Sequence, residues 1–435
     1  MQINRQGKPD PIFTHEGGRA VPVRPEVELR RRVMTCLLWE PTFYESGEGI
    51  AEGIAELVPR VAPEVVAALA VEARTVQHLR HVPLFLVREL ARIKGTGPLV
   101  RRTLAQVIQR ADELAEFLAL YWKEGKCPIS AGVKKGLADA FGKFGEYALA
   151  KYDRAKAVKL RDVMFLTHPR PTDPELYKRI AQRELEVPLT WEVELSAGKD
   201  KRVTFEKLMQ EGKLGGLATL RNLRNMQEAG VDKALVRERL AQGLDKVLPF
   251  RYCTAARMVP QWEGLLEAPM LRSLEGHPKL EGVTGLLVDV SGSMYGRLSA
   301  KGTATRVDVA AGLAILLREL GECEVWTFSH DVVAVPARRG FALRDAIAQS
   351  QRHGATHLRK ALEWLHRKAK LDRLIVITDE QSQDGGYPAW LQKSYLVNVA
   401  SYKNGVGYRD GWTHIDGWSE GVVGWILEEE RGICE

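Results

Sequence analysis

The pattern of hydrophobic and polar positions changes once along the chain. In the first two thirds, apolar residues recur at helical spacing, as they do at Val33, Met34 and Leu37. Beyond residue 282, short apolar runs alternate with helical stretches instead. We therefore predict two domains, a helical one over residues 1–270 and an α/β one over residues 280–435.

Start and stop signals in the helical region indicate short helices. Asp173, Pro174 and Glu175 have the order of an N-cap, a proline at the first helical position and an acid in the first turn. Gly125 and Gly230 are suited to end helices. Short helices joined by small turns favour stacked helix pairs, as in a HEAT-type solenoid. A two-layer helical globule is the alternative.

The last third has the alternating order of a doubly wound α/β domain. We predict strands over residues 283–290, 323–328, 374–378 and 394–400, and helices over 307–320, 358–369 and 418–429. The strands are apolar on both faces, which is typical of a parallel sheet covered by helices on both sides.

Composition excludes several classes of protein. The chain is 45% hydrophobic and 27% charged, which argues against a disordered or fibrous protein. No apolar run approaches the roughly 20 residues of a membrane helix, and the first residues, MQINRQGKPD, contain no apolar core of a signal peptide. The five cysteines are scattered, without a C-x-x-C pair. We expect a cytoplasmic monomer without membrane contact, disulfide framework or cysteine zinc site.

The net charge of +7 is unevenly distributed. Residues 281–435 contain 18 Lys and Arg against 20 Asp and Glu, which leaves a net charge of +9 on residues 1–280. A basic excess confined to one region favours a polyanion-binding surface, most often for nucleic acid. Solvated helix faces are the alternative explanation.

Oxygen-bearing side chains follow two of the predicted strands. Asp289, Ser291 and Ser293 occupy alternate positions after the first strand, and Asp379 ends the apolar strand LIVIT. Thr356 could add a further oxygen from a third loop. Carboxylates and hydroxyls without His or Cys suit a divalent cation, with Mg²⁺ as the first choice and Mn²⁺ or Ca²⁺ as alternatives. The alternative is that Asp289 only forms a turn and that Ser291 and Ser293 act as caps.

The same residues permit an enzyme. Asp289 and Asp379 with Mg²⁺ could perform phosphoryl transfer, as in a metal-dependent hydrolase acting on RNA. However, the sequence contains no G-x-x-x-x-G-K-[ST], H-E-x-x-H or G-x-S-x-G motif and no nucleophile with a supporting base. We therefore expect no catalytic residues.

Basic and aromatic residues interleave in the middle of the helical region. Such a mixture suits RNA with single-stranded parts, because cations neutralise phosphates and aromatic rings stack on unpaired bases. Phe141, Phe144 and Tyr147, however, are assigned to the core. The predicted RNA-binding residues of this segment are Lys134, Lys135, Lys143, Lys151, Arg154, Lys156, Lys159 and Arg161, and a second cluster contains Arg221 and Arg224.

Several stretches resemble one known family. FTHEGG (13–18), CLLWEPTFYESG (36–47), VKKGLADAFGKFGEYALAKY (133–152), KLRDVMFLTHPRP (159–171) and LATLRNLRNM (217–226) look like the bacterial branch of the Ro autoantigen family. DVSGSM and VITDE resemble the metal-ion-dependent adhesion site (MIDAS) of von Willebrand factor A domains. The resemblance covers essentially the whole chain.

The resemblance implies a ring of HEAT-like helical repeats, the TROVE module, whose two ends a von Willebrand A domain joins. It implies that the basic outer surface binds small noncoding Y RNA and that the central hole accepts single-stranded 3′ ends of misfolded or decaying RNA. It also implies an exoribonuclease partner, polynucleotide phosphorylase, and a partner carboxylate at the metal.

Residue by residue, the resemblance places Lys159, Arg161 and His168 at the RNA-contacting part of the ring. His168, which precedes Pro169, otherwise only caps a turn. From the residues alone, two further functions stay open, a metal-dependent enzyme and a protein-adhesion module. The +9 charge of the helical region disfavours the adhesion module.

Overall fold

The protein is described by a computed structural model. It covers residues 12–20, 23–35, 46–152, 157–171, 173–186, 188–242, 247, 249–298, 303–400, 405–407, 411–417 and 421–430.

The first two thirds of the described chain are helical. The helices are α1 (Pro25–Thr35), α2 (Gly47–Leu57), α3 (Pro63–Thr75), α4 (His81–Leu90), α5 (Gly97–Val107), α6 (Asp112–Tyr121), α7 (Ala131–Phe141), α8 (Glu146–Tyr152), α9 (Leu160–Thr167), α10 (Pro174–Gln182), α11 (Trp191–Ser196), α12 (Lys201–Gln210), α13 (Gly216–Glu228), α14 (Lys233–Leu240), α15 (Pro249–Met258) and α16 (Glu267–Arg272). The expected N-cap is confirmed, since Asp173 Oδ1 accepts hydrogen bonds from the amides of Glu175 and Leu176. Short 3₁₀ turns lie at Val58–Arg60 and Pro260–Leu265.

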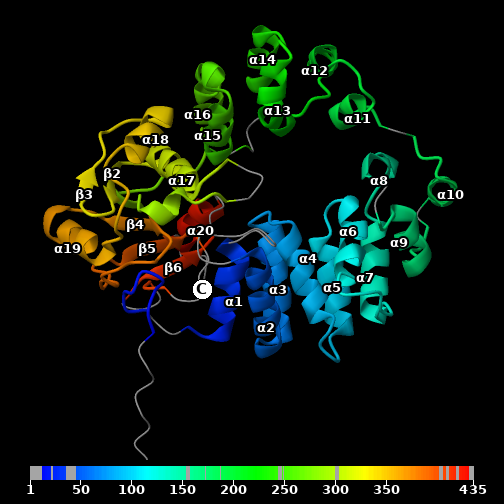
Figure 1. Ribbon diagram of the computed structural model, residues 1–435, viewed down its shortest axis with the longest axis horizontal. Coiled ribbons are helices and arrows are strands. Elements are labelled where there is room, and N and C mark those ends of the chain that lie inside the picture. The colour runs from blue at the N-terminus through cyan, green and yellow to red at the C-terminus, as the bar shows by residue number, and fades with distance from the viewer. Residues whose placement is uncertain are drawn as a thin grey trace, which may run out of the picture.

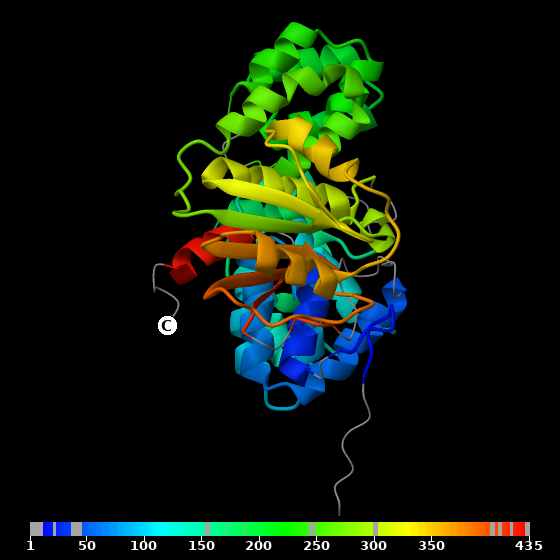
Figure 2. The ribbon, with the colours of Figure 1, turned by 90° about the vertical axis from the view of Figure 1, so that its left-hand side faces the viewer.

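The helices follow a closed path. Helices α1 to α7 and α9 stand side by side, with α8 above α9, and the chain returns through α10 to α16 to the α/β domain (Figure 1). Both ends of the helical region contact that domain, α1 at β6 (Thr413–Asp416) and α15 at α17 (Arg306–Leu320). In the side view, the α/β domain lies between the first helices and α12 to α16 (Figure 2). The expected ring, closed by the second domain, is therefore the observed arrangement.

The α/β domain contains one six-stranded sheet, in the order β3-β2-β1-β4-β5-β6. Its elements are β1 (Thr284–Asp289), α17, β2 (Cys323–Phe328), β3 (Val332–Ala334), α18 (Gly340–Ala348), α19 (Leu358–Lys368), β4 (Arg373–Thr378), β5 (Lys393–Asn398), β6 and α20 (Gly421–Glu430), with a 3₁₀ turn at Gly292–Tyr295. All neighbouring strands are parallel except β2 and β3. Four strands and the helices α17 and α19 lie where the sequence predicts them.

Three short elements differ from the prediction. The edge strand β3 is antiparallel, so the sheet is mixed, and neither β3, α18 nor β6 was expected. Strands of three or four residues carry too few positions for an alternating pattern to emerge. The predicted helix over residues 418–429 is observed as α20, and residues 418–420 lie outside the described part of the chain.

The hydrophobic cores do not follow the domain boundary. One core spans α1 to α10, whereas a second runs from α12 through α16 into one face of the sheet. Close packing of α15 against α17 joins the two parts, since a Cβ at Gly312 would lie 2.8 Å from Phe250 Cβ. A third core lies between the other face of the sheet and α19. The C-terminal half of the ring and the sheet are thus one packed unit.

Candidate functional site

The two predicted acidic residues meet at one edge of the sheet. Asp289 is the last residue of β1, and Asp379 directly follows β4, the parallel neighbour of β1. Both side chains are fully buried. Parallel strands end at the same edge, so residues 90 positions apart in sequence face one site.

The serines and a threonine complete the cluster. Ser293 Oγ donates a hydrogen bond to Asp379 Oδ2 at 2.5 Å, and Ser291 Oγ lies 3.3 Å from Ser293 Oγ. Thr378, which the sequence analysis did not single out, donates to Asp289 Oδ2 at 2.6 Å. Four of the five predicted metal ligands therefore lie in one chain of contacts.

The fifth residue, Thr356, is bonded through its backbone to the segment that follows Asp379, not to the other four residues. Its side chain is buried, and its carbonyl oxygen accepts hydrogen bonds from the Gln383 amide at 2.9 Å and Ser382 Oγ at 3.3 Å. These bonds fix the Thr356 loop beside the loop that follows Asp379.

The electrostatics of the cluster favour a cation. Burial, with the Asp379 carboxylate as the second cause, raises the pKa of Asp289 to about 7. Two buried carboxylates with hydroxyl groups around them form a hard, oxygen-only donor set of the type that Mg²⁺, Mn²⁺ or Ca²⁺ prefers. Within the described residues, no group of three or more His, Cys, Asp or Glu is arranged to hold a metal, so any cation here depends on the hydroxyls.

The loop after Asp379 also holds the N-terminal end of the ring. Thr14 Oγ1 donates to the Ser382 carbonyl at 2.9 Å, and the His15 amide donates to Gln381 Oε1 at 2.8 Å. A Cβ at Gly18 would collide with the Ser382 carbonyl oxygen. No local pattern predicts this contact, because its two sides are separated by more than 360 residues.

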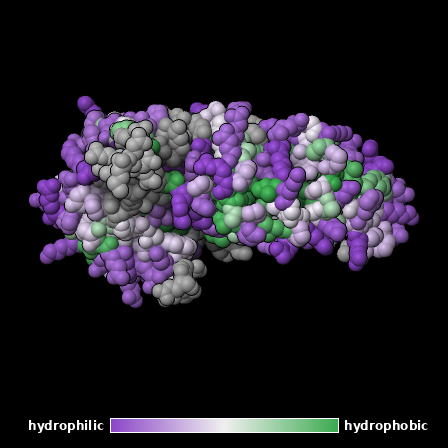
Figure 3. Space-filling model, turned by 90° about the horizontal axis from the view of Figure 1, so that it is seen from below, coloured by the Kyte–Doolittle hydropathy of each residue, from purple (hydrophilic) through white to green (hydrophobic). Residues whose placement is uncertain are grey.

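The predicted basic residues Lys134 and Lys135 are exposed on α7. Lys135, Arg101 and Arg102 line a groove of about 710 Å³ between α5 and α7. Arg101 is paired with Asp139 at 2.5 Å. Lys135 therefore adds a cation to the exposed surface of the helical row. Seen from below, the molecule is largely hydrophilic around a central band of apolar residues (Figure 3).

Helix α9 presents a basic and aromatic face. Arg161 and Phe165 are four residues apart on α9, so their side chains lie on one side of the helix, and His168 caps the C-terminal end of the helix. The Arg161 guanidinium lies 5.2 Å from the centre of the Phe165 ring, and this ring is 49% exposed. Lys159, at the N-cap of the same helix, is half-buried. The exposed Phe165 was missed by the sequence analysis, although its spacing from Arg161 could have revealed it.

His168 has two roles in this face. Its backbone adopts a left-handed conformation, with φ of 51°, and its amide bonds to the Met164 carbonyl at the end of α9. The expected turn cap is thus present, while the imidazole stays exposed.

Other predicted residues lie in different surroundings. Lys143 Nζ donates to the carbonyls of Ala105 and Ile108, at the end of α5, where a cation stabilises the helix. Lys151 lies 5.7 Å from the centre of the Tyr152 ring. Arg154 and Lys156 lie outside the described residues.

The aromatic side chains divide between core and surface. Phe141 is buried and Phe144 packs against the core as expected, but the core assignment of Tyr147 is wrong, since it is 62% exposed. Helix α8 is only seven residues long and buries Leu149 as its one core position. Tyr147 therefore adds an aromatic ring to the surface near Lys151.

The second basic cluster lies on the returning side of the ring. Arg221 and Arg224 are exposed on α13 and line a cavity opposite α15. Arg251 of α15 lines the same cavity and was not predicted.

Comparison with known protein families agrees with this architecture. The TROVE domain family matches residues 178–261, and the Ro60 vWA domain family matches residues 284–391. The chain thus combines a helical TROVE region with a von Willebrand A domain. In this combination of domains, the chain resembles Ro60 proteins.

A search of solved structures supports the fold. The crystal structure of Deinococcus radiodurans RO (RSR) protein is similar, with a TM-score of 0.60 and 18% sequence identity over 94% of this chain and 100% of that chain. The comparison with curated proteins found no match. The Ro60-like architecture implies an RNA-binding protein, and members of that family are generally non-catalytic. Among the helices described, none is long and apolar enough to cross a membrane.

Proposed function

We propose that this protein is a non-catalytic scaffold that binds structured RNA and presents single-stranded RNA ends to an exoribonuclease. The observation that carries the proposal is the surface formed by Arg161 and Phe165 of α9 together with the exposed His168 at the end of this helix. It combines a cation, an exposed ring and a hydrogen-bonding imidazole, which together suit phosphates and unpaired bases.

The surrounding charges support the same proposal. Lys134 and Lys135 lie on α7, Lys151 on α8 and Lys159 at the start of α9, and α7 packs directly against α9. An RNA that crossed these helices would meet several cations along one path, as phosphate contacts require. The partners we propose are a Y-like noncoding RNA on this outer surface, single-stranded 3′ ends within the ring, and polynucleotide phosphorylase or another exoribonuclease.

We further propose that the cluster at the sheet edge holds one divalent cation, with Mg²⁺ as the first choice. Asp289, Ser291, Ser293, Thr356 and Asp379 would hold it. A bound cation would supply positive charge and an open coordination position for a carboxylate of a protein partner. Because both aspartates are buried, a partner carboxylate could reach the cation only from the edge of the sheet.

The RNA-binding proposal is tested by fluorescence anisotropy with a labelled RNA hairpin that carries a single-stranded 3′ tail. Phe165→Ala should weaken binding by about 1–3 kcal/mol if the ring stacks on a base. Trp364→Ala is the matched control, since Trp364 is a similarly exposed aromatic residue on α19. Equal binding by wild type and Phe165→Ala would show that RNA does not use this face.

A further inference from the structure

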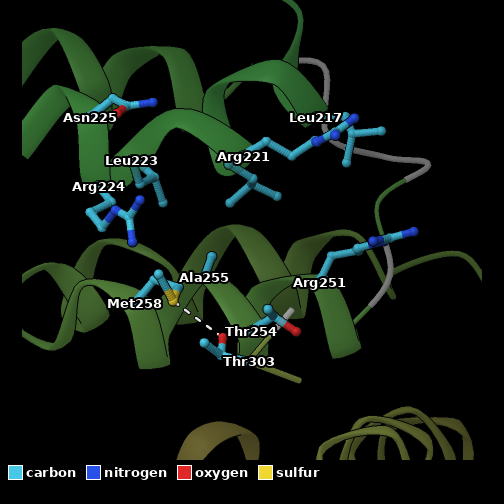
Figure 4. A pocket seen from close by; sticks show the side chains of 11 residues that line it. Leu217, Arg221, Leu223, Arg224, Asn225, Arg251, Thr254, Ala255, Met258 and Thr303 are labelled. Atoms are coloured by element: carbon cyan, nitrogen blue, oxygen red, sulfur yellow. Dashed lines mark hydrogen bonds between the residues drawn. The ribbon is translucent and has the colours of Figure 1, made fainter. Parts of the chain in front are cut away.

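A cavity of about 410 Å³ lies where the helical ring returns to the von Willebrand A domain. Helices α13 and α15 form its two sides, and Thr303 comes from the segment that precedes α17 (Figure 4). Its volume falls within the range of small-ligand sites. Neither of the two matching domain families assigns a ligand to this cavity.

The charge of the cavity has one sign. Arg221 and Arg224 come from α13 and Arg251 from α15, whereas none of the described residues that line the cavity is acidic. Arg224 lies 3.6 Å from Glu228, but both side chains are more than half exposed, so this pair is weak. Arg221 forms no ion pair with any residue that the structure describes. Arg251 also lies 4.5 Å from the centre of the Phe250 ring. An anionic ligand in this cavity would meet three arginines and no acidic side chain of the described lining.

The apolar part of its lining distinguishes this cavity from a simple anion site. Leu217, which is 45% exposed, and Leu220, Leu223, Ala255 and Met258 give it an apolar lining. Arg221 and Arg251 extend toward the same side of the cavity, one from each helix, while Arg224 points toward Met258 (Figure 4). A ligand that contacts all of these groups has an anionic part and an apolar part.

We infer that this cavity binds one unpaired nucleotide of an RNA chain, with its phosphate between Arg221 and Arg251 and its base against the leucines and Met258. The inference rests on the proposed RNA binding and adds a second, separate contact on the returning side of the ring. Guanidinium groups bond phosphate in a planar fork and also stack on bases. Asn225 and Thr254 provide polar atoms for the edge of the base.

The test uses single-stranded uridine octamers, labelled with fluorescein, and the full-length protein. The double variant Arg221→Ala/Arg251→Ala should bind at least about tenfold more weakly than wild type, because charge-assisted hydrogen bonds are lost. Arg237→Ala is the matched control. Arg237 is an exposed arginine on the neighbouring helix α14 that does not line the cavity, and its loss should change affinity little.

The base contact is tested separately. An octamer that contains 4-thiouridine should crosslink, on irradiation, to peptides from α13 or α15. Leu217→Asn should reduce this crosslink while leaving the charges of the cavity intact. Circular dichroism verifies that each variant is folded, and the changes are at exposed positions, so folding should be preserved.

The outcomes separate this inference from the proposed function. If wild type binds the octamer, but the double variant binds equally well and no crosslink maps to α13 or α15, the cavity inference is wrong and RNA binding stands. If wild type binds no RNA, both fail. If a phosphoserine peptide binds in an Arg221-dependent way and the octamer does not, the cavity recognises a phosphoprotein and the inference is overturned.

Discussion

Arg31 of α1 and Glu380, the residue after Asp379, form a buried ion pair that closes the ring. Arg31 Nη1 lies 3.4 Å from Glu380 Oε2, and both side chains are fully buried, although 349 positions separate them in the sequence. Glu380 also contacts the His414 ring and accepts a hydrogen bond from the Gly407 amide at 3.3 Å. Burial opposes its ionisation, but His414 and Arg31 lower the pKa of Glu380 to about 2.

The first prediction concerns this pair. Arg31→Met should lower the free energy of unfolding by roughly 3–5 kcal/mol, because it leaves the Glu380 carboxylate buried with one cation fewer. Urea unfolding followed by tryptophan fluorescence measures the change.

The neighbouring Arg30 provides the matched control. Arg30 pairs with Glu72 at 2.6 Å, but the two side chains are 42% and 33% exposed. Arg30→Met should therefore cost less than about 1 kcal/mol. Similar effects of the two substitutions would mean that the Arg31 pair does not hold the ring closed.

The second prediction concerns pH. Burial lowers the pKa of His414, but the Glu380 and Asp416 carboxylates outweigh burial and the nearby Arg31 and raise it above its usual 6.5. The stabilisation by protonated His414 is therefore complete below pH 6.5 and is lost as the pH rises through the folded-state pKa. The difference in unfolding free energy between wild type and His414→Gln should be largest below pH 6.5 and should shrink at alkaline pH. Urea titrations across this range measure it, and a difference that grows with pH would contradict the assignment.

The third prediction tests the metal site. Mg²⁺ at about one hundred times its dissociation constant should stabilise the wild-type protein by roughly 2.7 kcal/mol, seen as a higher melting temperature. Asp289→Ala should abolish this Mg²⁺-dependent shift and leave RNA affinity nearly unchanged. Asp345→Ala, at an exposed acid on α18, should retain the shift. A shift that persists in Asp289→Ala would place the cation elsewhere.

The fourth prediction uses salt to identify phosphate contacts. For about four single-strand contacts, log K should fall with log salt with a slope of roughly −2.8. Lys159→Ala should make the slope shallower by about 0.7 for every RNA sequence, because a phosphate contact carries no base information. Lys368→Ala, at an exposed lysine of α19, should leave the slope unchanged. Equal slopes for wild type and Lys159→Ala would remove Lys159 from the RNA path.

The fifth prediction concerns catalysis. Purified protein with Mg²⁺ should leave single-stranded RNA uncut over hours, since the two aspartates have no accompanying nucleophile and base. Gel analysis of a labelled RNA measures this. Cleavage that disappears in Asp379→Asn would favour a metal-dependent hydrolase instead.

Features that depend on neighbours along the chain could be predicted from the sequence. The Asp173 cap, the strand that ends at Asp289 and the alternating order of strands and helices are all local patterns. The meeting of Asp289 with Asp379 was also predictable, because the carboxyl ends of parallel strands share one edge. Polar residues that follow parallel strands can therefore be expected to form one site before the structure is known.

Which surfaces are covered, and which distant residues pair, depends on how the helices and the sheet pack in three dimensions. Helical periodicity predicts an apolar face but not what covers it, so spacing alone did not show that the Tyr147 ring is exposed. The pairing of Arg31 with Glu380 and the position of Arg251 opposite Arg221 depend on how the ring closes. Closure of the ring brings together residues that are hundreds of positions apart, and local sequence patterns do not show which of these residues will meet.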